Sequence, residues 1–265
     1  MNILVTGGTG ALGKPLVRIL RGNGHRVVVL SRRPGEGADW RTGDLATGVG
    51  LAEAVTGMEA VIHAGSATTN LTRAEAIDVE GTRRLLEVAA EAGVGHLVYV
   101  SIVGMEGIPY PYYGAKLKTE RRVKDGPIPW TILRATQFHN LMEVFLTPLS
   151  KLPGLLTLPR GWQFQPCATD DVAARLATVV TEAPAGLLPD FGGPEVLRFD
   201  DIALAWTRAR GQKRRIVHVP IPMAFSRDFA AGKLLAPAHR DGTITFSQYL
   251  EKRYPQERSG AGRET

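Results

Sequence analysis

Short β-rich apolar runs alternate with amphipathic segments through the first half of the chain. This alternation predicts βαβ units, in which parallel strands are joined by right-handed helical crossovers. The apolar runs predict strands at Asn2–Thr6, Arg26–Ser31, Asp39–Arg41, Ala60–Ala64, His96–Ser101 and Trp130–Arg134. Apolar residues at helical spacing predict helices at Leu12–Arg21, Leu51–Thr56, Arg73–Ala92 and Tyr113–Lys124. We therefore expect an α/β fold of the Rossmann type, with a doubly wound parallel sheet.

The pattern loosens after residue 140, where prolines separate short segments. It predicts helices from Thr169 to Val180 and after Asp200-Asp201, a strand at Arg215–Val219, a helical stretch to Gly232 and a last helix at Phe246–Tyr254. We expect a Rossmann domain at residues 1–140, a small C-terminal substrate lobe at 141–255 that is interleaved with it, and a disordered tail at 256–265.

The first predicted strand enters a glycine-rich turn, Val5-Thr6-Gly7-Gly8-Thr9-Gly10-Ala11-Leu12-Gly13, which opens an amphipathic helix. A strand, a glycine turn and a helix in this order form the device that holds a dinucleotide pyrophosphate. Gly7 and Gly8 allow the sharp turn. Gly10 lets the backbone approach the phosphates, and Gly13 lets the helix pack on the strand. The helix N-terminus adds N–H groups and a positive dipole end, so the turn predicts a dinucleotide site rather than an ordinary glycine-rich turn.

The end of the second predicted strand indicates which dinucleotide is bound. About 20 residues after the glycines, an NAD site carries an acid that binds the ribose 2′-hydroxyl. This chain has Ser31-Arg32-Arg33 there, and no acid before Glu36. A guanidinium pairs with a 2′-phosphate, which a carboxylate would repel, and Ser31 adds a hydroxyl donor. We therefore expect NADP(H) in preference to NAD(H), the alternative being two solvated loop arginines.

Composition narrows the class of protein. With 265 residues, 44% hydrophobic and 22% charged, the chain is ordinary for a globular protein. The net charge of +6 raises the question of a nucleic-acid partner, but the arginines are spread out and form no basic block, so none is expected. The single Cys167 excludes an internal disulfide, and we expect no metal site.

Membrane and export signals are missing from the pattern. No run of about 18 apolar residues predicts a membrane span, and the first residues enter a strand with no room for a signal peptide. We therefore expect a cytoplasmic protein that acts on a small molecule and has no membrane partner. The pattern leaves its oligomeric state open.

Four segments together resemble the short-chain dehydrogenase/reductase superfamily: Thr6–Gly13, Asp44-Leu45, Ala64-Gly65 and Tyr112-Tyr113-Gly114-Ala115-Lys116. Within it, residues 1–140 are most similar to the atypical NmrA-like and quinone-reductase-like NAD(P)H-binding proteins. The resemblance implies hydride transfer. It also implies that the cofactor is bound by Thr6, Gly7, Gly10, Ala11, Leu12, Gly13, Ser31, Arg32, Arg33, Asp44, Leu45, Ala64, Gly65, Ser101 and Lys116.

The chemistry of this superfamily uses a Tyr-x-x-x-Lys pair, and Tyr112 and Lys116 have that spacing on one helix face. Phenols titrate near pH 10, so a neighbouring cation is needed for acid/base work near neutrality. The resemblance implies Tyr112 as acid/base and Lys116 as the cation that also holds the nicotinamide ribose. Standard members add a Ser or Thr that binds the substrate carbonyl, but Ser101 comes too early and Ile102 or Val103 occupies that place. A packed, non-catalytic Tyr112 is therefore the alternative.

The segment after the sixth predicted strand is expected to form a pocket wall. Ligands in open α/β sheets bind beyond the carboxyl ends of the strands. We therefore expect Val103, Phe138 and His139 to line the substrate pocket, with His139 titrating near neutral pH. The alternative places Phe138 in the core and His139 in a loop.

Other residues that could carry chemistry have structural explanations. His63, at the end of the fourth strand, is expected to be a packed turn residue rather than a catalyst. Asp170-Asp171 precedes an apolar helix and suits its N-terminus. We expect Cys167 to be buried packing.

Two functions from different classes fit these features. The leading hypothesis is an NADP(H)-dependent oxidoreductase of a small carbonyl, enone or quinone; solvent can protonate a reduced quinone without help from the tyrosine. The alternative is a non-catalytic NADP(H)-binding regulator of the NmrA-like type, favoured by the missing carbonyl-binding Ser or Thr. A sugar-nucleotide epimerase or dehydratase shares the fold but would need an acid at the end of the second strand.

Overall fold

Seven parallel strands form the central sheet. The computed structural model describes residues 1–35, 37–68 and 71–255. In sheet order the strands are β3 (Trp40–Thr42), β2 (Arg26–Ser31), β1 (Asn2–Thr6), β4 (Ala60–His63), β5 (His96–Ile102), β6 (Trp130–Ala135) and β9 (Gly186–Leu187). The order reverses between β1 and β4, so the crevice where this kind of sheet binds ligands lies at the carboxyl ends of these two strands. The predicted Rossmann-type sheet is confirmed.

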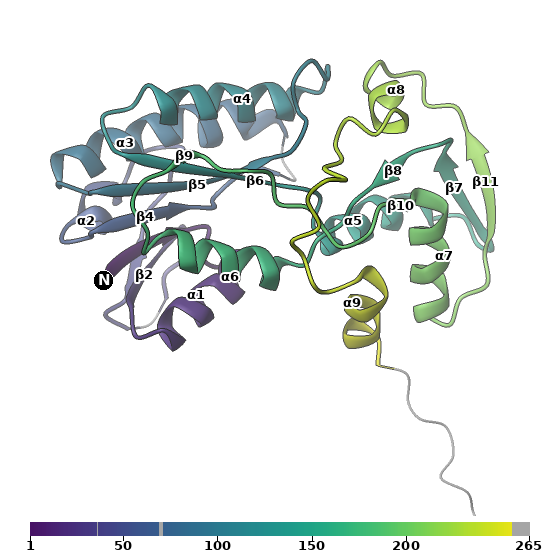
Figure 1. Ribbon diagram of the computed structural model, residues 1–265, viewed down its shortest axis with the longest axis horizontal. Helices are drawn as coiled ribbons and strands as arrows, with labels where there is room; N and C mark the ends of the chain where they lie inside the picture. Colours follow the sequence, from purple (N-terminus) through teal and green to yellow (C-terminus); the bar gives the residue numbers. More distant parts are fainter. Residues whose placement is uncertain (36, 69–70, 256–265) are drawn as a thin grey trace, which may run out of the picture.

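Helices cover both faces of the sheet (Figure 1). One face carries α1 (Gly13–Gly22) and α6 (Thr169–Val179); the other carries α2 (Leu51–Val55), α3 (Glu80–Glu91) and α4 (Pro111–Lys124). Each layer packs its own apolar side chains against the sheet, such as Leu16, Leu20 and Leu176 on one face and Leu85, Leu86 and Val123 on the other. Because both faces are buried, the strands are almost continuous apolar runs.

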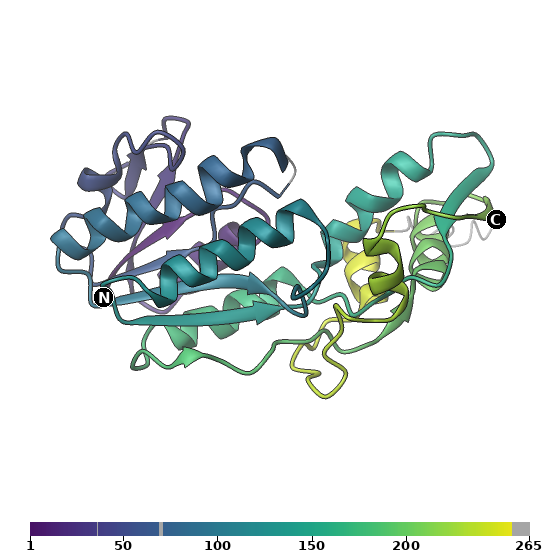
Figure 2. The same cartoon turned by 90° about the horizontal axis from the view of Figure 1, so that it is seen from above.

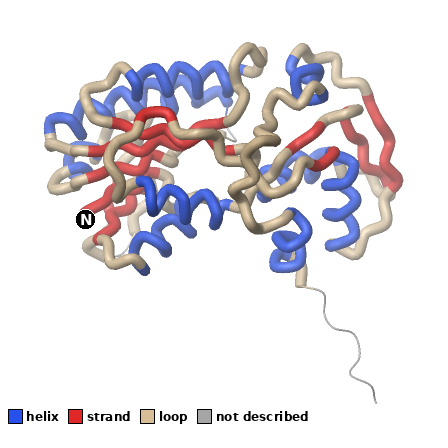
Figure 3. Tube along the Cα trace, viewed as in Figure 1, coloured by secondary structure: helices blue, strands red, loops and turns tan. Residues whose placement is uncertain are grey.

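The chain beyond β6 builds a second lobe at the carboxyl edge of the sheet (Figures 1 and 2). Its elements are α5 (His139–Leu149), β7 (Leu155–Pro159), β8 (Gln163–Phe164), β10 (Leu197–Arg198), α7 (Phe199–Ala209), β11 (Arg215–Val219), α8 (Phe225–Ala230) and α9 (Phe246–Arg253). Two small sheets, β10–β8 and β11–β7, stand among these helices (Figure 3). Between β8 and β10 the chain returns to the main sheet to form α6 and β9. Rings of Trp162, Phe164 and Phe199 contact one another in the core of this lobe.

Several predicted elements differ from the structure. The single helix predicted at 73–92 is divided into a 3₁₀ turn (Leu71–Arg73), a π-helical turn (Glu75–Val79) and α3. Helix α4 begins at Pro111, two residues earlier than predicted, because a proline is well tolerated at the first helical position. The short strands β7, β8, β9 and β10 and helix α5 were not predicted. The tail predicted at 256–265 lies outside the described residues.

Candidate functional site

The glycine-rich turn between β1 and α1 rests on the end of β4. Gly7 has a φ of +70°, and a Cβ there would lie 2.7 Å from the Gly65 nitrogen; a Cβ on Gly13 would lie 2.1 Å from the Gly7 carbonyl oxygen. A Cβ on Gly10 would meet only that carbonyl, at 3.1 Å, so the outer side of the turn is open. The first N–H groups of a helix have no partner within the helix. The turn can therefore present backbone donors to an anion, and the backbone of Ala64-Gly65 lies directly against it on the opposite side.

A buried chain of hydrogen bonds ties this turn to the opposite helical layer. The Gly65 N–H donates to Thr6 Oγ1 (3.1 Å), and Thr6 Oγ1 lies 2.6 Å from His63 Nδ1. His63 Nε2 lies 2.8 Å from Thr82 Oγ1, which donates to the Asp78 carbonyl. Burial, helped by the positive charge of Lys116, lowers the pKa of His63 to about 3. His63 is therefore a neutral packed residue, as predicted, although it lies in β4 and not in a turn.

Thr6 and Leu12 point their side chains into the core, where they are 0% and 6% exposed. Ala11, between them on the turn, is exposed. Thr6 therefore offers almost no accessible atom to a cofactor in this structure, and Leu12 offers little surface.

The loop after β2 presents two exposed arginines, Arg32 and Arg33. Because β2 pairs with β1, this loop lies next to the glycine turn that follows β1. The Arg33 N–H donates to Ser31 Oγ (3.2 Å), and the indole N–H of Trp40 donates to the Arg33 carbonyl (3.0 Å). Within the described ranges, neither guanidinium forms an ion pair. These contacts hold the loop backbone and leave both guanidinium groups available to a ligand.

The Asp44-Leu45 pair shapes the next loop, after β3. The Ala46 N–H donates to Asp44 Oδ1 (2.9 Å), so Asp44 closes its own turn. Leu45 is buried and would lie 3.1 Å from a Cβ on Gly65. This places the pair beside the end of β4, at the border of the crevice.

Tyr112 lies in the first turn of α4 and is 7% exposed. Its hydroxyl lies 2.7 Å from Ser66 Oγ and 3.2 Å from Thr68 Oγ1. Ser66 donates its own proton to the Asp78 carboxylate, so the phenol donates to Ser66. Burial, with a further contribution from the charge of Asp78, raises the pKa of Tyr112 to about 12. In this arrangement Tyr112 is a weak acid engaged with the loop after β4.

Lys116 follows Tyr112 by one helical turn and is also buried. Its ammonium donates to the Val100 carbonyl (2.8 Å) and lies 4.2 Å from the centre of the Tyr99 ring. Burial lowers the pKa of Lys116 to about 8, although Asp78 and Glu120 act in the opposite direction. The helix thus brings the predicted pair to one face, while the lysine binds strand β5.

Ser101 and Val103 lie at the end of β5 with little exposure, 3% and 2%. Ser101 lies beside Glu120 of α4. Burial acts to raise the pKa of that carboxylate, but Arg134, with a smaller contribution from Ser101, lowers it. The Val103 N–H donates to the Ala135 carbonyl (3.2 Å). Both side chains belong to the packing of the sheet edge in this structure.

Phe138 and His139 open helix α5. Phe138 is half-buried against the core and pairs with Cys167, whose buried thiol has a pKa raised to about 12. His139 is 1% exposed; its Nε2 donates to the Ile244 carbonyl (2.9 Å), and burial lowers its pKa. Its ring lies 5.2 Å from that of Tyr249 on α9. His139 therefore ties α5 to α9 within the second lobe as a neutral side chain.

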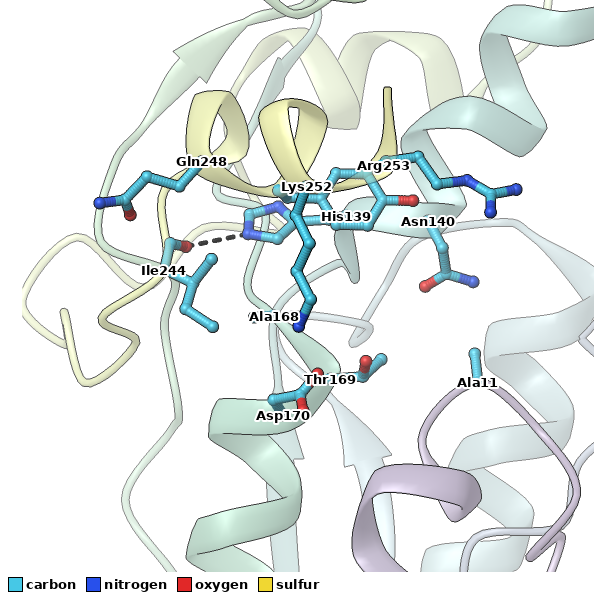
Figure 4. A pocket seen from close by; sticks show the side chains of 11 residues that line it. Ala11, His139, Asn140, Ala168, Thr169, Asp170, Ile244, Gln248, Lys252 and Arg253 are labelled. Carbon is cyan, nitrogen blue, oxygen red and sulfur yellow. Dashed lines mark hydrogen bonds between the residues drawn. The ribbon is translucent and has the colours of Figure 1, made fainter. Parts of the chain in front are cut away.

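A cavity of about 300 Å³ lies between the glycine turn and helix α9 (Figure 4). Its walls come from Ala11 of the turn, His139 and Asn140 of α5, the start of α6, and the α9 side chains that face them. Among the residues predicted to line the substrate pocket, His139 lines this cavity, whereas Val103 and Phe138 do not. The part contributed by α9 could not be found from the sequence, because the helix is separated from the turn by more than two hundred residues.

Asp170 and Asp171 lie in the first turn of α6, where acidic residues are favoured. Asp170 pairs with Arg18 (2.7 Å), and Asp171 accepts the N–H groups of Thr243 (2.8 Å) and Ile244 (3.0 Å). Both carboxylates therefore tie α6 to its neighbours.

In the ranges that the structure describes, no group of three or more His, Cys, Asp or Glu side chains could hold a metal ion, and no helix is long and apolar enough to cross a membrane.

The sequence matches a known family model along most of the sheet domain. Residues 7–182 match the family described as NAD(P)H-binding. An uncharacterised protein of Mycobacterium tuberculosis (strain ATCC 25618 / H37Rv) is 30% identical over 221 residues, which are 78% of this chain but 23% of that protein. The chain thus spans about a quarter of the mycobacterial relatives that it matches.

Two further proteins are similar over nearly the whole chain. The photosystem II assembly factor Ycf39 of Guillardia theta is 23% identical over 270 residues, covering 96% of this chain and 84% of its own. The NADPH-dependent quinone oxidoreductase QOR2 of Escherichia coli, solved with NADPH, superposes with a TM-score of 0.76 at 18% identity, covering 95% of this chain and 99% of that one. At this identity the likeness concerns the fold.

Proposed function

Because the chain belongs to the family of NAD(P)H-binding proteins, we propose that it is an NADP(H)-dependent oxidoreductase that reduces a small carbonyl, enone or quinone. The observation that carries the proposal is the glycine turn with its open outer side, next to the exposed Arg32-Arg33 pair. An oxidoreductase-type family and a fold shared with a named quinone oxidoreductase support it.

The turn fits a dinucleotide because Gly7, Gly10 and Gly13 leave no side chain between the backbone and a pyrophosphate. In the proposal the N–H groups of the turn and of the start of α1 bind the pyrophosphate. Arg32 and Arg33 bind the 2′-phosphate of NADP(H), in preference to NAD(H). Ala64-Gly65 and Asp44-Leu45 border the adenosine side of the site.

The bound dinucleotide supplies the hydride, and the chain supplies orientation and a proton. Tyr112 can donate a proton only while it is protonated, and its pKa of about 12 keeps it so at neutral pH. Lys116 can hold the nicotinamide ribose once its ammonium leaves the Val100 carbonyl. The loop from Ser66 to Thr68 covers the phenol, so substrate access to Tyr112 requires this loop to move.

NADPH consumption with menadione as acceptor tests the proposal. The wild-type chain should oxidise NADPH faster in the presence of menadione than without it. If Tyr112 supplies the proton, kcat of Tyr112→Phe falls by about 10²-fold, and Lys116→Ala raises KM for NADPH. A wild-type chain that binds NADPH but reduces none of a broad panel of carbonyls, enones and quinones would contradict an enzymatic role.

The burial of Tyr112 favours a second candidate, a non-catalytic NADP(H)-binding regulator. Here the phenol's hydrogen bonds to Ser66 and Thr68 close the site, and a bound dinucleotide is a signal rather than a reactant. The similarity to Ycf39, which is named as an assembly factor, is compatible with this role. Tight NADPH binding without turnover would select this candidate.

A further inference from the structure

The cavity between the glycine turn and α9 has a positively charged wall. Lys252 and Arg253 line it from α9, and Figure 4 shows the Lys252 side chain reaching down from that helix toward the start of α6. A wider groove of about 720 Å³ shares Ala11, Asn140 and Arg253 with this cavity and adds Lys14 of α1. The two hollows therefore adjoin each other.

The cations here outnumber the carboxylates that could neutralise them. Across the described ranges, no carboxylate lies within 4 Å of the ammonium of Lys252 or Lys14. Of the two carboxylates on the walls, Asp170 pairs with Arg18 (2.7 Å), and Glu143 accepts the hydroxyls of Tyr249 and Tyr254 and pairs with Arg253 (3.8 Å). Among the described residues, Lys252 and Lys14 are the wall cations that this pairing leaves without a carboxylate. This imbalance favours an anion in the cavity.

Two buried acceptors on the same walls lack partners. His139 Nε2 donates to the Ile244 carbonyl, so Nδ1 of this neutral ring carries a lone pair. Neither His139 Nδ1 nor Asn140 Oδ1 has a hydrogen-bond partner in the part of the chain that the structure describes, although both atoms are buried. Buried acceptors of this kind are normally satisfied. Both residues line the cavity, but these two atoms are closed off from it, so a ligand hydroxyl or N–H group satisfies them only after the two side chains shift toward the cavity.

We propose that this cavity binds a substrate that is a small hydroxylated anion, with Lys252 and Arg253 holding its phosphate or carboxylate group. Asn140 and His139 accept its hydroxyl donors. The inference rests on the proposed function, because the cavity touches Ala11 and so places this molecule beside the dinucleotide. Tyr112 does not line the cavity, so in this proposal the cavity holds the anionic end of the substrate and the carbonyl end extends beyond it. It narrows the substrate from small carbonyl compounds in general to those that carry a negative charge.

Calorimetric titration of the full chain saturated with NADPH tests this, with D-ribose 5-phosphate, D-ribonate and uncharged D-ribose as probes. The account predicts that at least one anion binds and that ribose does not. The anion that binds more tightly shows whether the cavity prefers a phosphate or a carboxylate group. Lys252→Met should weaken anion binding at least fivefold and Lys252→Met/Arg253→Met at least tenfold. NADPH affinity should stay within twofold, and the exposed Lys213→Met should change neither.

Three results would overturn the inference: no binding of either anion, equal binding of ribose, or anion binding that is unchanged in the folded Lys252→Met protein. A parallel loss of NADPH affinity in the variants would also overturn it, since the cations would then hold the cofactor. Failure of the wild-type chain to bind NADPH would contradict the proposed function instead. The same probes, titrated into the cofactor-free chain, would still test the cavity.

Discussion

At the scale of single residues, the main feature of the site is the burial of ionisable groups under the sheet edge. Tyr112, Lys116 and His63 each have a pKa shifted toward the neutral form, and burial is the largest cause in all three. Burying a charge costs free energy unless a partner compensates it. We therefore expect the buried ammonium of Lys116 to lower the free energy of unfolding.

Replacing Lys116 with Met should stabilise the fold and remove a pH dependence. Below pH 8 the folded and unfolded chains both carry the lysine proton, so the full cost of burial is present. Between pH 8 and the ordinary value of 10.5 only the folded chain releases the proton, so stability rises with pH. From pH 7 to pH 9.5 the wild-type free energy of unfolding should rise by about 2 kcal/mol relative to Lys116→Met. Urea denaturation at both pH values measures this, and parallel changes in the two proteins would contradict it.

At the scale of elements, the junction of β1 and α1 depends on a tight approach of backbone to backbone. Gly13 begins α1 directly over the Gly7 carbonyl, so the helix can lie this close to the turn only without a side chain. The glycine turn also lies against Ala64-Gly65, and this contact fixes the position of the turn relative to β4. The direction in which α1 presents its N-terminus is therefore set by these contacts.

Gly13→Ala should disrupt this junction, whereas Gly22→Ala at the other end of the same helix should not. A Cβ at Gly13 would lie 2.1 Å from a carbonyl oxygen, and a Cβ at Gly22 would meet nothing within 4 Å. We expect Gly13→Ala to lower the free energy of unfolding by about 2 kcal/mol and to weaken NADPH binding at least tenfold. Gly22→Ala should change stability by less than about 1 kcal/mol. Urea titration and calorimetry measure both; equal behaviour of the two variants would refute the argument.

At the scale of the whole molecule, one carboxylate joins three helices of the C-terminal lobe. Glu143 of α5 accepts the indole N–H of Trp206 on α7 (3.2 Å) and the hydroxyls of Tyr249 and Tyr254 at α9. His139 and Phe246 add a ring contact between α5 and α9. These contacts hold α9 over the glycine turn, so the charged wall of the cavity depends on them.

Glu143→Gln should therefore destabilise the protein more than a matched change elsewhere. An amide oxygen accepts weaker hydrogen bonds than a carboxylate, so the free energy of unfolding should fall by about 2 kcal/mol. Glu91→Gln, at the exposed end of α3, should change it by less than about 0.5 kcal/mol. Chemical denaturation of both variants is the measurement. A Glu143→Gln protein as stable as Glu91→Gln would show that α9 is held by its apolar residues alone.

The sequence predicted the sheet domain far better than the second lobe. Strands β1, β2, β4, β5 and β6 are apolar runs, and the resemblance to NAD(P)H-binding proteins predicted from their connecting turns is confirmed by the family match. The predicted Rossmann-type fold is confirmed by the structure. Strands β8, β9 and β10 have two residues each and depend on distant partners, so they leave no periodic signal. Ser66, Asp78 and Lys252 were missed for the same reason, since folding alone brings them to the site.

The most direct measurement is calorimetric titration with NADPH and NADH of the wild-type chain, of Arg32→Ala/Arg33→Ala, and of Arg121→Ala/Arg122→Ala as an exposed arginine pair on α4. The account predicts that the wild-type chain binds NADPH more tightly than NADH. Arg32→Ala/Arg33→Ala should lose this preference because its affinity for NADPH falls at least tenfold, and Arg121→Ala/Arg122→Ala should keep it. Equal affinity of wild type for the two nucleotides, or no binding of either, would contradict the central claim.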